Sequence, residues 1–254
     1  KFISFNEIQK KPKINGKYIH VTFDDGYFNN SKIVPILEEY NIPAHIFVVT
    51  NNIINSHKFW WDIVYNKRMS SNTTLKNIKN EISFLQRNHY KDIYIYIKEN
   101  FGNNSFEPIS DLDRPFRADE LTSLNQNELI TIGNHTSDHA ILKNLLIDEA
   151  REQIELAQKK LEIILGKAPN SFAFPNNGYN KKHLEIFKTL GIDFAFCGDY
   201  KHNNIHKGLI GENRLLLGRF DILDSRNIDY QLKMLRAGIT PFILAKKLQR
   251  ILSL

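Results

Sequence analysis

The segment "YIHVTFDDGYFNN" (residues 18–30) joins a strand pattern to two adjacent aspartates. Apolar and polar residues alternate over its first six positions, which is typical of a β-strand, and Asp24, Asp25 and Gly26 follow at once. Aspartate and glycine both favour tight turns, so these residues could simply reverse the chain. Carboxylates at the end of a strand could also form a metal site with a base beside it, and residues elsewhere in the chain decide between the two interpretations.

Strand and helix patterns alternate along most of the chain, which predicts βα units around a parallel sheet. A helix is predicted over 29–41, with Pro35 in its first turn, and an amphipathic helix over 147–165, ending at Gly166. The other predicted elements are strands over 42–49, 171–175, 193–197 and 214–222, a strand with a polar turn over 127–142, and a helix over 181–191.

Two regions depart from this alternation. Residues from about 56 to 102 are rich in helix formers and charges without strand signals, which predicts a helical insertion after the second strand. The aromatic residues of this region are expected to be packing anchors rather than sugar platforms: Trp60, Trp61 and Tyr65. An amphipathic helix is predicted at about 240–253, where it could contact an anionic membrane surface or pack against the barrel.

The composition is that of a single soluble domain over residues 1–254. Of the 254 residues, 42% are hydrophobic and 24% are charged, and no apolar run approaches the roughly 18 residues of a membrane-spanning helix. The net charge of +6 comes from scattered Lys and Arg, which favours a solvated basic surface over a nucleic-acid site. We therefore expect no nucleic-acid partner.

Cysteine usage and the first residues bear on the compartment. Cys197 is the one cysteine, which excludes an internal disulfide framework and fits a reducing environment. No charged-then-apolar leader follows Lys1, so the sequence leaves the compartment open and slightly favours the cytoplasm.

A pair of histidines follows a predicted strand, as the aspartates do. In "NHTSDH", His135 and His139 are four positions apart, and on a helical turn this spacing places both imidazoles on one face. Loops that follow barrel strands gather at the same end of the barrel. One carboxylate and two imidazoles are a donor set suited to Zn²⁺. Because adjacent side chains on an extended segment diverge, one aspartate is expected to bind the ion while the other accepts a proton.

Several motifs resemble those of the polysaccharide deacetylases, a carbohydrate esterase family that removes N-acetyl groups from amino-sugar polymers. The similar segments are "TFDDG" (22–26), "IPAHIFV" (42–48), "HTSDH" (135–139) and "FAFPNNG" (172–178). The resemblance extends over about 20–220, outside the helical insertion, and the motifs occur in the family's order.

The resemblance implies a distorted (β/α)7-type barrel and a metal-dependent hydrolase acting on an N-acetylated glycan or amino-sugar precursor, such as one of a bacterial envelope. It implies that a divalent cation, Zn²⁺ by preference, is bound by Asp25, His135 and His139. Asp24 would be the base as metal-bound water attacks the acetamide. The cleft wall would be shaped by the third motif: Phe174, Pro175 and Asn176.

The chain departs from the family pattern at two positions. Many members carry an arginine that orients the base where this chain has Ala173, and a late histidine that protonates the amine where this chain has Arg219. Arginine cannot release a proton at ordinary pH but pairs well with carboxylates, so we expect Arg219 to orient Asp24. The acid would then be a metal-bound water or one of three other histidines: His45, His202 and His206.

Three alternatives stay open at this point. Two histidines and a carboxylate also form the facial triad of iron-dependent oxygenases, although there the first histidine and the carboxylate usually form H-x-D. Because the family's arginine and histidine are missing, the chain could be a non-catalytic glycan-binding relative. The second aspartate argues against this, since a protein that only binds gains nothing from a base beside the metal ligand. A hydrolase of a small amide or cyclic imide would use the same fold and site.

Overall fold

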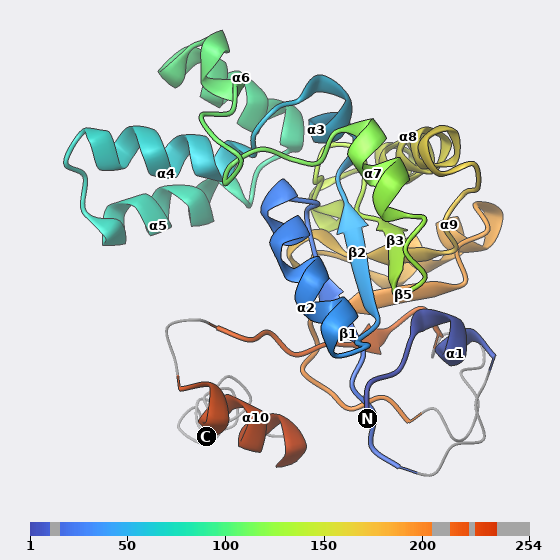
Figure 1. Cartoon of the computed structure of the whole chain (residues 1–254). Helices are drawn as coiled ribbons and strands as arrows, with labels where there is room; N and C mark the ends of the chain where they lie inside the picture. The colour runs from blue at the N-terminus through green and yellow to red at the C-terminus, as the bar shows by residue number, and fades with distance from the viewer. Residues whose placement is uncertain (11–15, 205–213, 224–226, 238–254) are drawn as a thin grey trace, which may run out of the picture.

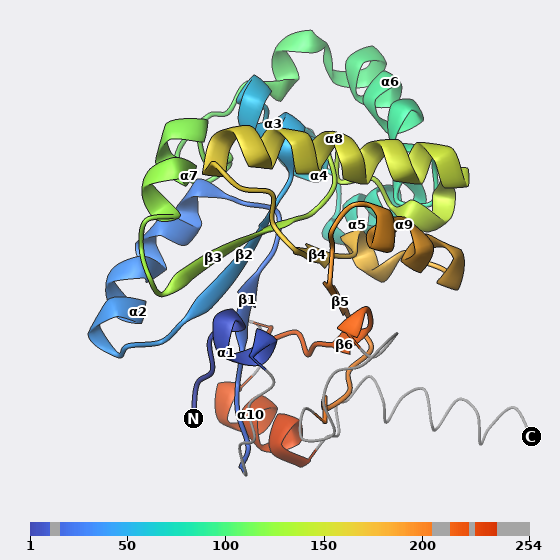
Figure 2. The ribbon, with the colours of Figure 1, turned by 90° about the vertical axis from the view of Figure 1, so that its right-hand side faces the viewer.

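The computed structural model describes residues 1–10, 16–204, 214–223 and 227–237. Its centre is one parallel sheet of six strands that are paired in sequence order. The sheet curls into a half-barrel (Figures 1 and 2). The strands are β1 (Val21–Phe23), β2 (Ala44–Val48), β3 (Ile130–Asn134), β4 (Ser171–Ala173), β5 (Phe194–Cys197) and β6 (Leu217–Gly218). This architecture confirms the predicted α/β class, a distorted and incomplete barrel.

Helices cover the outer face of the sheet. They are α2 (Val34–Glu39), α7 (Ala118–Leu124), α8 (Ile147–Leu165) and α9 (Leu184–Thr189). One buried cluster joins Leu37 of α2 and Leu161 of α8 to Ile46 and Ile132 of the central strands. Because alternate strand residues point to opposite faces, the other face of the same strands is free to fill the barrel interior.

Two helix boundaries agree with the sequence pattern. Helix α8 occupies the predicted range and is followed by Gly166, whose φ of 73° is the left-handed conformation that glycine adopts at low cost. The predicted helix over 29–41 divides into a 3-10 segment, η1 (Phe28–Ile33), and α2. Pro35 lies in the first turn of α2, where a missing backbone N–H costs no hydrogen bond.

Large apolar side chains fill the barrel interior. Phe47, Phe194 and Phe196 form a buried cluster there, and Phe5 of α1 (Phe5–Gln9) packs edge-on against Phe194, at the amino-terminal start of β5. Gly133 of β3 makes room for them, because a Cβ at this position would lie 2.5 Å from ring atoms of Phe47. Helix α1 therefore closes the end of the barrel opposite the carboxyl ends of the strands.

Four α-helices lie between β2 and α7. They are α3 (Thr50–Asn55), α4 (Trp60–Ser70), α5 (Leu75–Leu85) and α6 (Tyr90–Phe101), and the last three extend to one side of the barrel (Figure 1). Helices α4, α5 and α6 have a core of their own, in which Trp60 and Ile97 are buried and Trp61 is partly buried. Tyr65 is 44% exposed and belongs to no part of this core, so the expectation that it anchors the packing is wrong.

The last described element is α10 (Ile228–Ala237). The predicted amphipathic helix at about 240–253, its membrane contact, and His206 lie outside the described residues. Within the described ranges, no helix combines the length and apolar character needed to cross a membrane.

Candidate metal centre

The two aspartates after β1 point in different directions because the backbone turns between them. Asp25 has a φ of 73° and Gly26 a φ of 84°, so the extended strand ends abruptly here. A Cβ on Gly26 would lie 2.8 Å from Cγ1 of Val48. The carbonyl oxygen of Gly26 accepts a hydrogen bond from the backbone N–H of Phe116. The turn therefore depends on glycine, and it aims the two carboxylates at different partners.

The two histidines lie in an irregular loop after β3. Thr136 and His139 both have positive φ, 70° and 52°, so this segment is a polar turn, as predicted, and not a turn of helix. Asn134 holds the loop instead, since its Oδ1 accepts from the N–H of Thr136 at 2.7 Å. The hydroxyl of Thr136 in turn accepts from the N–H of Ala140 at 2.9 Å. Side-chain bonds of this kind compete with helix formation, which explains why the four-residue spacing did not produce a helix.

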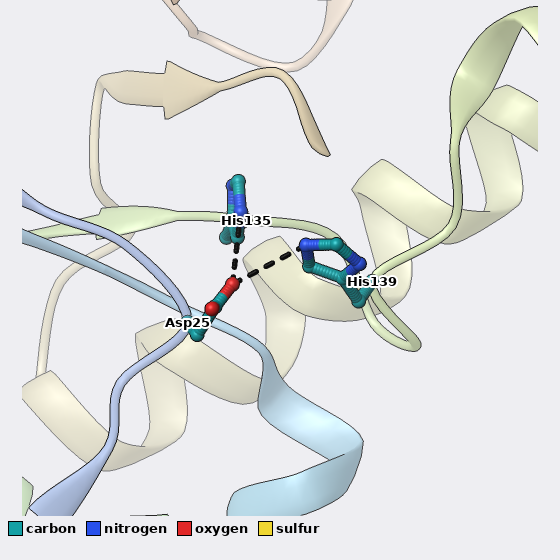
Figure 3. Close-up of side chains that lie close together, drawn as sticks. All are labelled: Asp25, His135 and His139. Carbon is teal, nitrogen blue, oxygen red and sulfur yellow. Dashed lines mark ion pairs between the residues drawn. The ribbon is translucent and has the colours of Figure 1, made fainter. Parts of the chain in front are cut away.

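Asp25, His135 and His139 converge on one point (Figure 3). Oδ1 of Asp25 lies 3.4 Å from Nε2 of His135 and 3.2 Å from Nε2 of His139. A tetrahedral Zn²⁺ with ligand bonds near 2.0 Å separates its ligand atoms by about 3.3 Å. The donor types and the two separations from Asp25 therefore fit a divalent cation, and all three ligand atoms lie within 4.8 Å of one another.

The protonation pattern also fits a cation. Nδ1 of His135 lies 2.8 Å from the carbonyl oxygen of Ala173 and donates to it, so Nε2 is the nitrogen that faces Asp25: it donates to the carboxylate when the ring is protonated and offers a lone pair to a cation when the ring is neutral. Burial opposes ionisation of Asp25, but hydrogen bonds from His135 and His139 hold the pKa of its carboxyl well below the ordinary value. An ionised carboxylate and a correctly oriented imidazole are both ready to act as ligands.

Asp24 is held by an arginine from the far edge of the sheet. Nη1 and Nη2 of Arg219 donate to the two carboxylate oxygens of Asp24 at 2.6 and 2.7 Å, and Nη1 also lies 3.2 Å from Oγ1 of Thr22. Burial raises the pKa of Asp24, but the positive charges of Arg219 and His135 and the hydrogen bonds from Arg219 together outweigh it, so the pKa lies below the usual value. Asp24 Oδ2 is 4.0 Å from Nε2 of His135, which places a second carboxylate beside the candidate ligands.

The contact between Arg219 and Asp24 bridges β6 and β1, the two ends of the described sheet. Ala173, where the family carries arginine, contributes only a small side chain to this interior. The guanidinium thus reaches the carboxylate from another strand, as the sequence led us to expect.

The third motif is only partly exposed to solvent. Phe174 is 2% exposed, and its ring stacks on Tyr179 in the core beneath the helices, so it lies away from any cleft wall. The reason is the alternation along β4, which turns Phe172 and Phe174 toward the helices while Ala173 faces the barrel interior. Pro175 is buried, whereas Asn176 is exposed in a left-handed conformation with φ of 49°.

The histidines considered as acids have structural partners. His45 is fully buried, and its ring nitrogens lie 2.9 Å from Oγ of Ser171 and 3.4 Å from Nε2 of His20. His202 is exposed and bonded to the carbonyl oxygen of Leu235 at 2.7 Å. Neither arrangement brings an imidazole to the candidate ligands, so the acid stays unassigned.

One contact at the site was not predicted. The indole of Trp61 lies 4.6 Å from the imidazole of His139, measured between ring centroids. The pattern "FWWD" marked an aromatic cluster, but nothing in its spacing indicates that the insertion turns back onto a loop almost eighty residues later in the chain.

Several solved structures share this fold. The chain superposes on the deacetylase PplD of Streptococcus pyogenes, solved with acetate, with a TM-score of 0.59 at 16% identity, covering 92% of this chain and 79% of that one. A de-N-acetylase from Aggregatibacter actinomycetemcomitans superposes with a TM-score of 0.59 at 17% identity, covering 92% of this chain and 82% of that one. The polysaccharide deacetylase BC0361 of Bacillus cereus superposes with a TM-score of 0.60 at 17% identity, and the match covers 92% of this chain but only 56% of that chain.

Sequence comparison identifies the family directly. No curated protein matches the chain at a significant level. The family model described as polysaccharide deacetylase, in contrast, matches residues 11–195, which is most of the chain and includes both the aspartate pair and the histidine pair. The chain therefore belongs to the polysaccharide deacetylase family, hydrolases that act on amide bonds of polysaccharides.

Proposed function

We propose that this chain is a metal-dependent deacetylase that removes N-acetyl groups from the amino sugars of a bacterial envelope glycan. The divalent cation, Zn²⁺ according to the donor set, would be held by Asp25, His135 and His139. The observation that carries the proposal is the short distance from Oδ1 of Asp25 to Nε2 of each histidine, together with a second ionised carboxylate 4.0 Å from Nε2 of His135. A site that only binds an ion does not need this second carboxylate.

When bound, a divalent cation at this position polarises the amide carbonyl and lowers the pKa of a water molecule. Asp24 then serves as the base that takes the proton of the attacking water. Arg219 fixes both oxygens of Asp24, so the carboxylate stays charged and keeps one orientation. The proton on Nδ1 of His135 is held by the carbonyl oxygen of Ala173, which keeps that imidazole in the tautomer that can bind a cation.

The family and one neighbour support the glycan as substrate. PplD was solved with acetate, which is the acid that N-deacetylation releases. A small amide or imide would use the same site, so the test compares polymer with monomer.

The experiment incubates purified protein with N-acetylglucosamine oligomers and with the monomer, and measures acetate release after chelation and after return of Zn²⁺. We expect release from oligomers that is lost on chelation and restored by the ion. Asp25→Ala should lose ion binding, whereas Asp24→Asn should bind the ion normally and lose about 10²–10⁴-fold in kcat. Acetate release that persists in both variants after thorough chelation would contradict the proposal.

A further inference from the structure

The helical insertion reaches the candidate metal centre through Trp61. Trp61 is the second residue of α4. Its indole ring is tilted by 60° against the imidazole of His139, and the two ring centroids are 4.6 Å apart. This distance lies at the short end of the range for packed aromatic rings. The insertion is thus in direct contact with a candidate ligand.

Neighbouring side chains of the insertion and of β1's turn hold Trp61 in place. Its ring stacks on Phe59 at 4.8 Å with an interplanar angle of 16°. Its Nε1 donates to the hydroxyl of Tyr27 at 2.7 Å, and this hydroxyl donates to a carboxylate oxygen of Asp62 at 2.6 Å. The stacking on Phe59 and the two linked hydrogen bonds through the hydroxyl of Tyr27 together fix the orientation of the indole.

The insertion itself is attached to the barrel at two separate places. Near its start, the buried ammonium group of Lys58 lies 3.7 Å from the carboxylate of Asp113. At the turn between α5 and α6, Nδ2 of Asn144 donates to the carbonyl oxygens of Gln86 and Asn88 at 3.0 and 3.1 Å. One attachment lies near the start of the insertion and the other at its α5–α6 turn, so moving the insertion away from the loop of His139 would break these contacts.

The two candidate histidine ligands are supported in different ways. His135 is fixed by the hydrogen bond from its Nδ1 to Ala173. For His139, no partner of Nδ1 is found among the described residues, and the residue has a φ of 52°. A cavity of about 10 Å³, which also contacts Asp138 and Trp60, lies beside this residue. Apart from the contact of Nε2 with Asp25, its imidazole therefore depends on packing for its orientation, and Trp61 is an aromatic ring in contact with it.

We infer that Trp61 is a positioning residue that holds the imidazole of His139 in the orientation needed to bind the cation. The inference rests on the metal site proposed above and adds a role for the insertion, since the insertion would then contribute to ion affinity without supplying a ligand. Outer residues that orient ligands typically change metal affinity by about 10–100-fold when they are removed.

The test measures Co²⁺ and Zn²⁺ dissociation constants and the visible absorption spectrum of bound Co²⁺, which reports ligand geometry. We expect Trp61→Ala to weaken binding by about 10–100-fold and to alter the spectrum. Trp61→Phe keeps an aromatic ring against His139 and should restore most of the affinity, although it loses the bond to Tyr27.

A matched control separates positioning from stability of the insertion. Ile97→Ala removes a fully buried side chain from the same helical core without a contact to His139. It should lower the melting temperature while leaving ion affinity unchanged. The inference is overturned if Trp61→Ala binds the ion as the native chain does, or if Ile97→Ala weakens binding to the same extent. Absence of ion binding by the native chain would instead remove the proposed metal site itself.

Discussion

At the scale of single residues, the chemistry depends on which way two neighbouring carboxylates point. The positive φ of Asp25 sends its side chain to the histidines, while Asp24 stays on the strand's inward face with Arg219. The sequence could predict this division because two adjacent aspartates cannot share one direction. The partner of Asp24 was predicted from the resemblance to the family, since the family's arginine is absent at position 173 and an arginine stands at position 219 in place of the late histidine.

Replacing Arg219 by lysine tests how the base is held. Lysine keeps the charge but cannot form two parallel hydrogen bonds to one carboxylate. We expect kcat for acetate release to fall by about 10-fold or more, with the dissociation constant of the metal unchanged, because Arg219 bonds to none of the three candidate ligands. Steady-state kinetics and ion titration measure the two effects.

A second arginine provides the control. Arg114 makes the same two-bond contact with Glu120, at 2.8 and 2.9 Å, away from the candidate site. Arg114→Lys should leave kcat unchanged. Native turnover in Arg219→Lys would show that the orientation of Asp24 does not matter.

At the scale of elements, patterns with a clear period predicted structure better than patterns of spacing. Helix α8 was predicted to the residue because its apolar positions repeat regularly and Gly166 ends it. The four-residue spacing of the histidine pair would suit a helical turn, but side-chain bonds to Asn134 and Thr136 produce an irregular loop. The contact of Trp61 with His139 could not be predicted, since it joins two elements that no local pattern relates.

Gly133→Ala tests the packing between adjacent strands. The added methyl group would lie 2.5 Å from ring atoms of Phe47 and 2.8 Å from Nε2 of His45, both in the crowded interior. Overpacking of this kind costs about 1–3 kcal/mol. Urea denaturation should show a loss of that size in the free energy of unfolding.

The comparison is Gly166→Ala at the end of α8. No atom lies within 4 Å of a Cβ there, so only the positive φ opposes the change, at a cost of about 1 kcal/mol. If the two variants are equally stable, the close contact in β3 is relieved by small shifts and does not limit the packing.

At the scale of the whole molecule, the barrel encloses two histidines in an uncharged chain of hydrogen bonds. Nδ1 of His20 lies 3.0 Å from the carbonyl oxygen of Ile3 and must donate to it, so His20 accepts from His45, which in turn accepts from Ser171. Burial lowers the pKa of His20 to about 4 and that of His45 well below its usual value, and the nearby charge of Arg219 lowers both further. The folded barrel therefore favours the neutral rings.

This arrangement predicts a loss of stability in mild acid. The unfolded chain protonates a histidine near pH 6.5 and the folded chain only near pH 4, so stability is lost as pH falls between these values. From His20 alone, the free energy of unfolding should drop by about 2 kcal/mol between pH 7 and pH 5. Urea denaturation of the native chain and of His20→Gln measures the difference, and NMR titration of His20 gives its pKa directly. An imidazole of His20 that protonates at pH 6 in the folded protein would contradict the prediction.

The bridge from Arg219 to Asp24 has a practical consequence for anyone who wishes to trap a bound sugar in crystals. The proposed base also fastens the first strand to the last, so an inactive variant should alter its charge while preserving its shape. Asparagine at position 24 retains one oxygen for the guanidinium, whereas alanine would leave that buried cation without its partner and let the two edges separate.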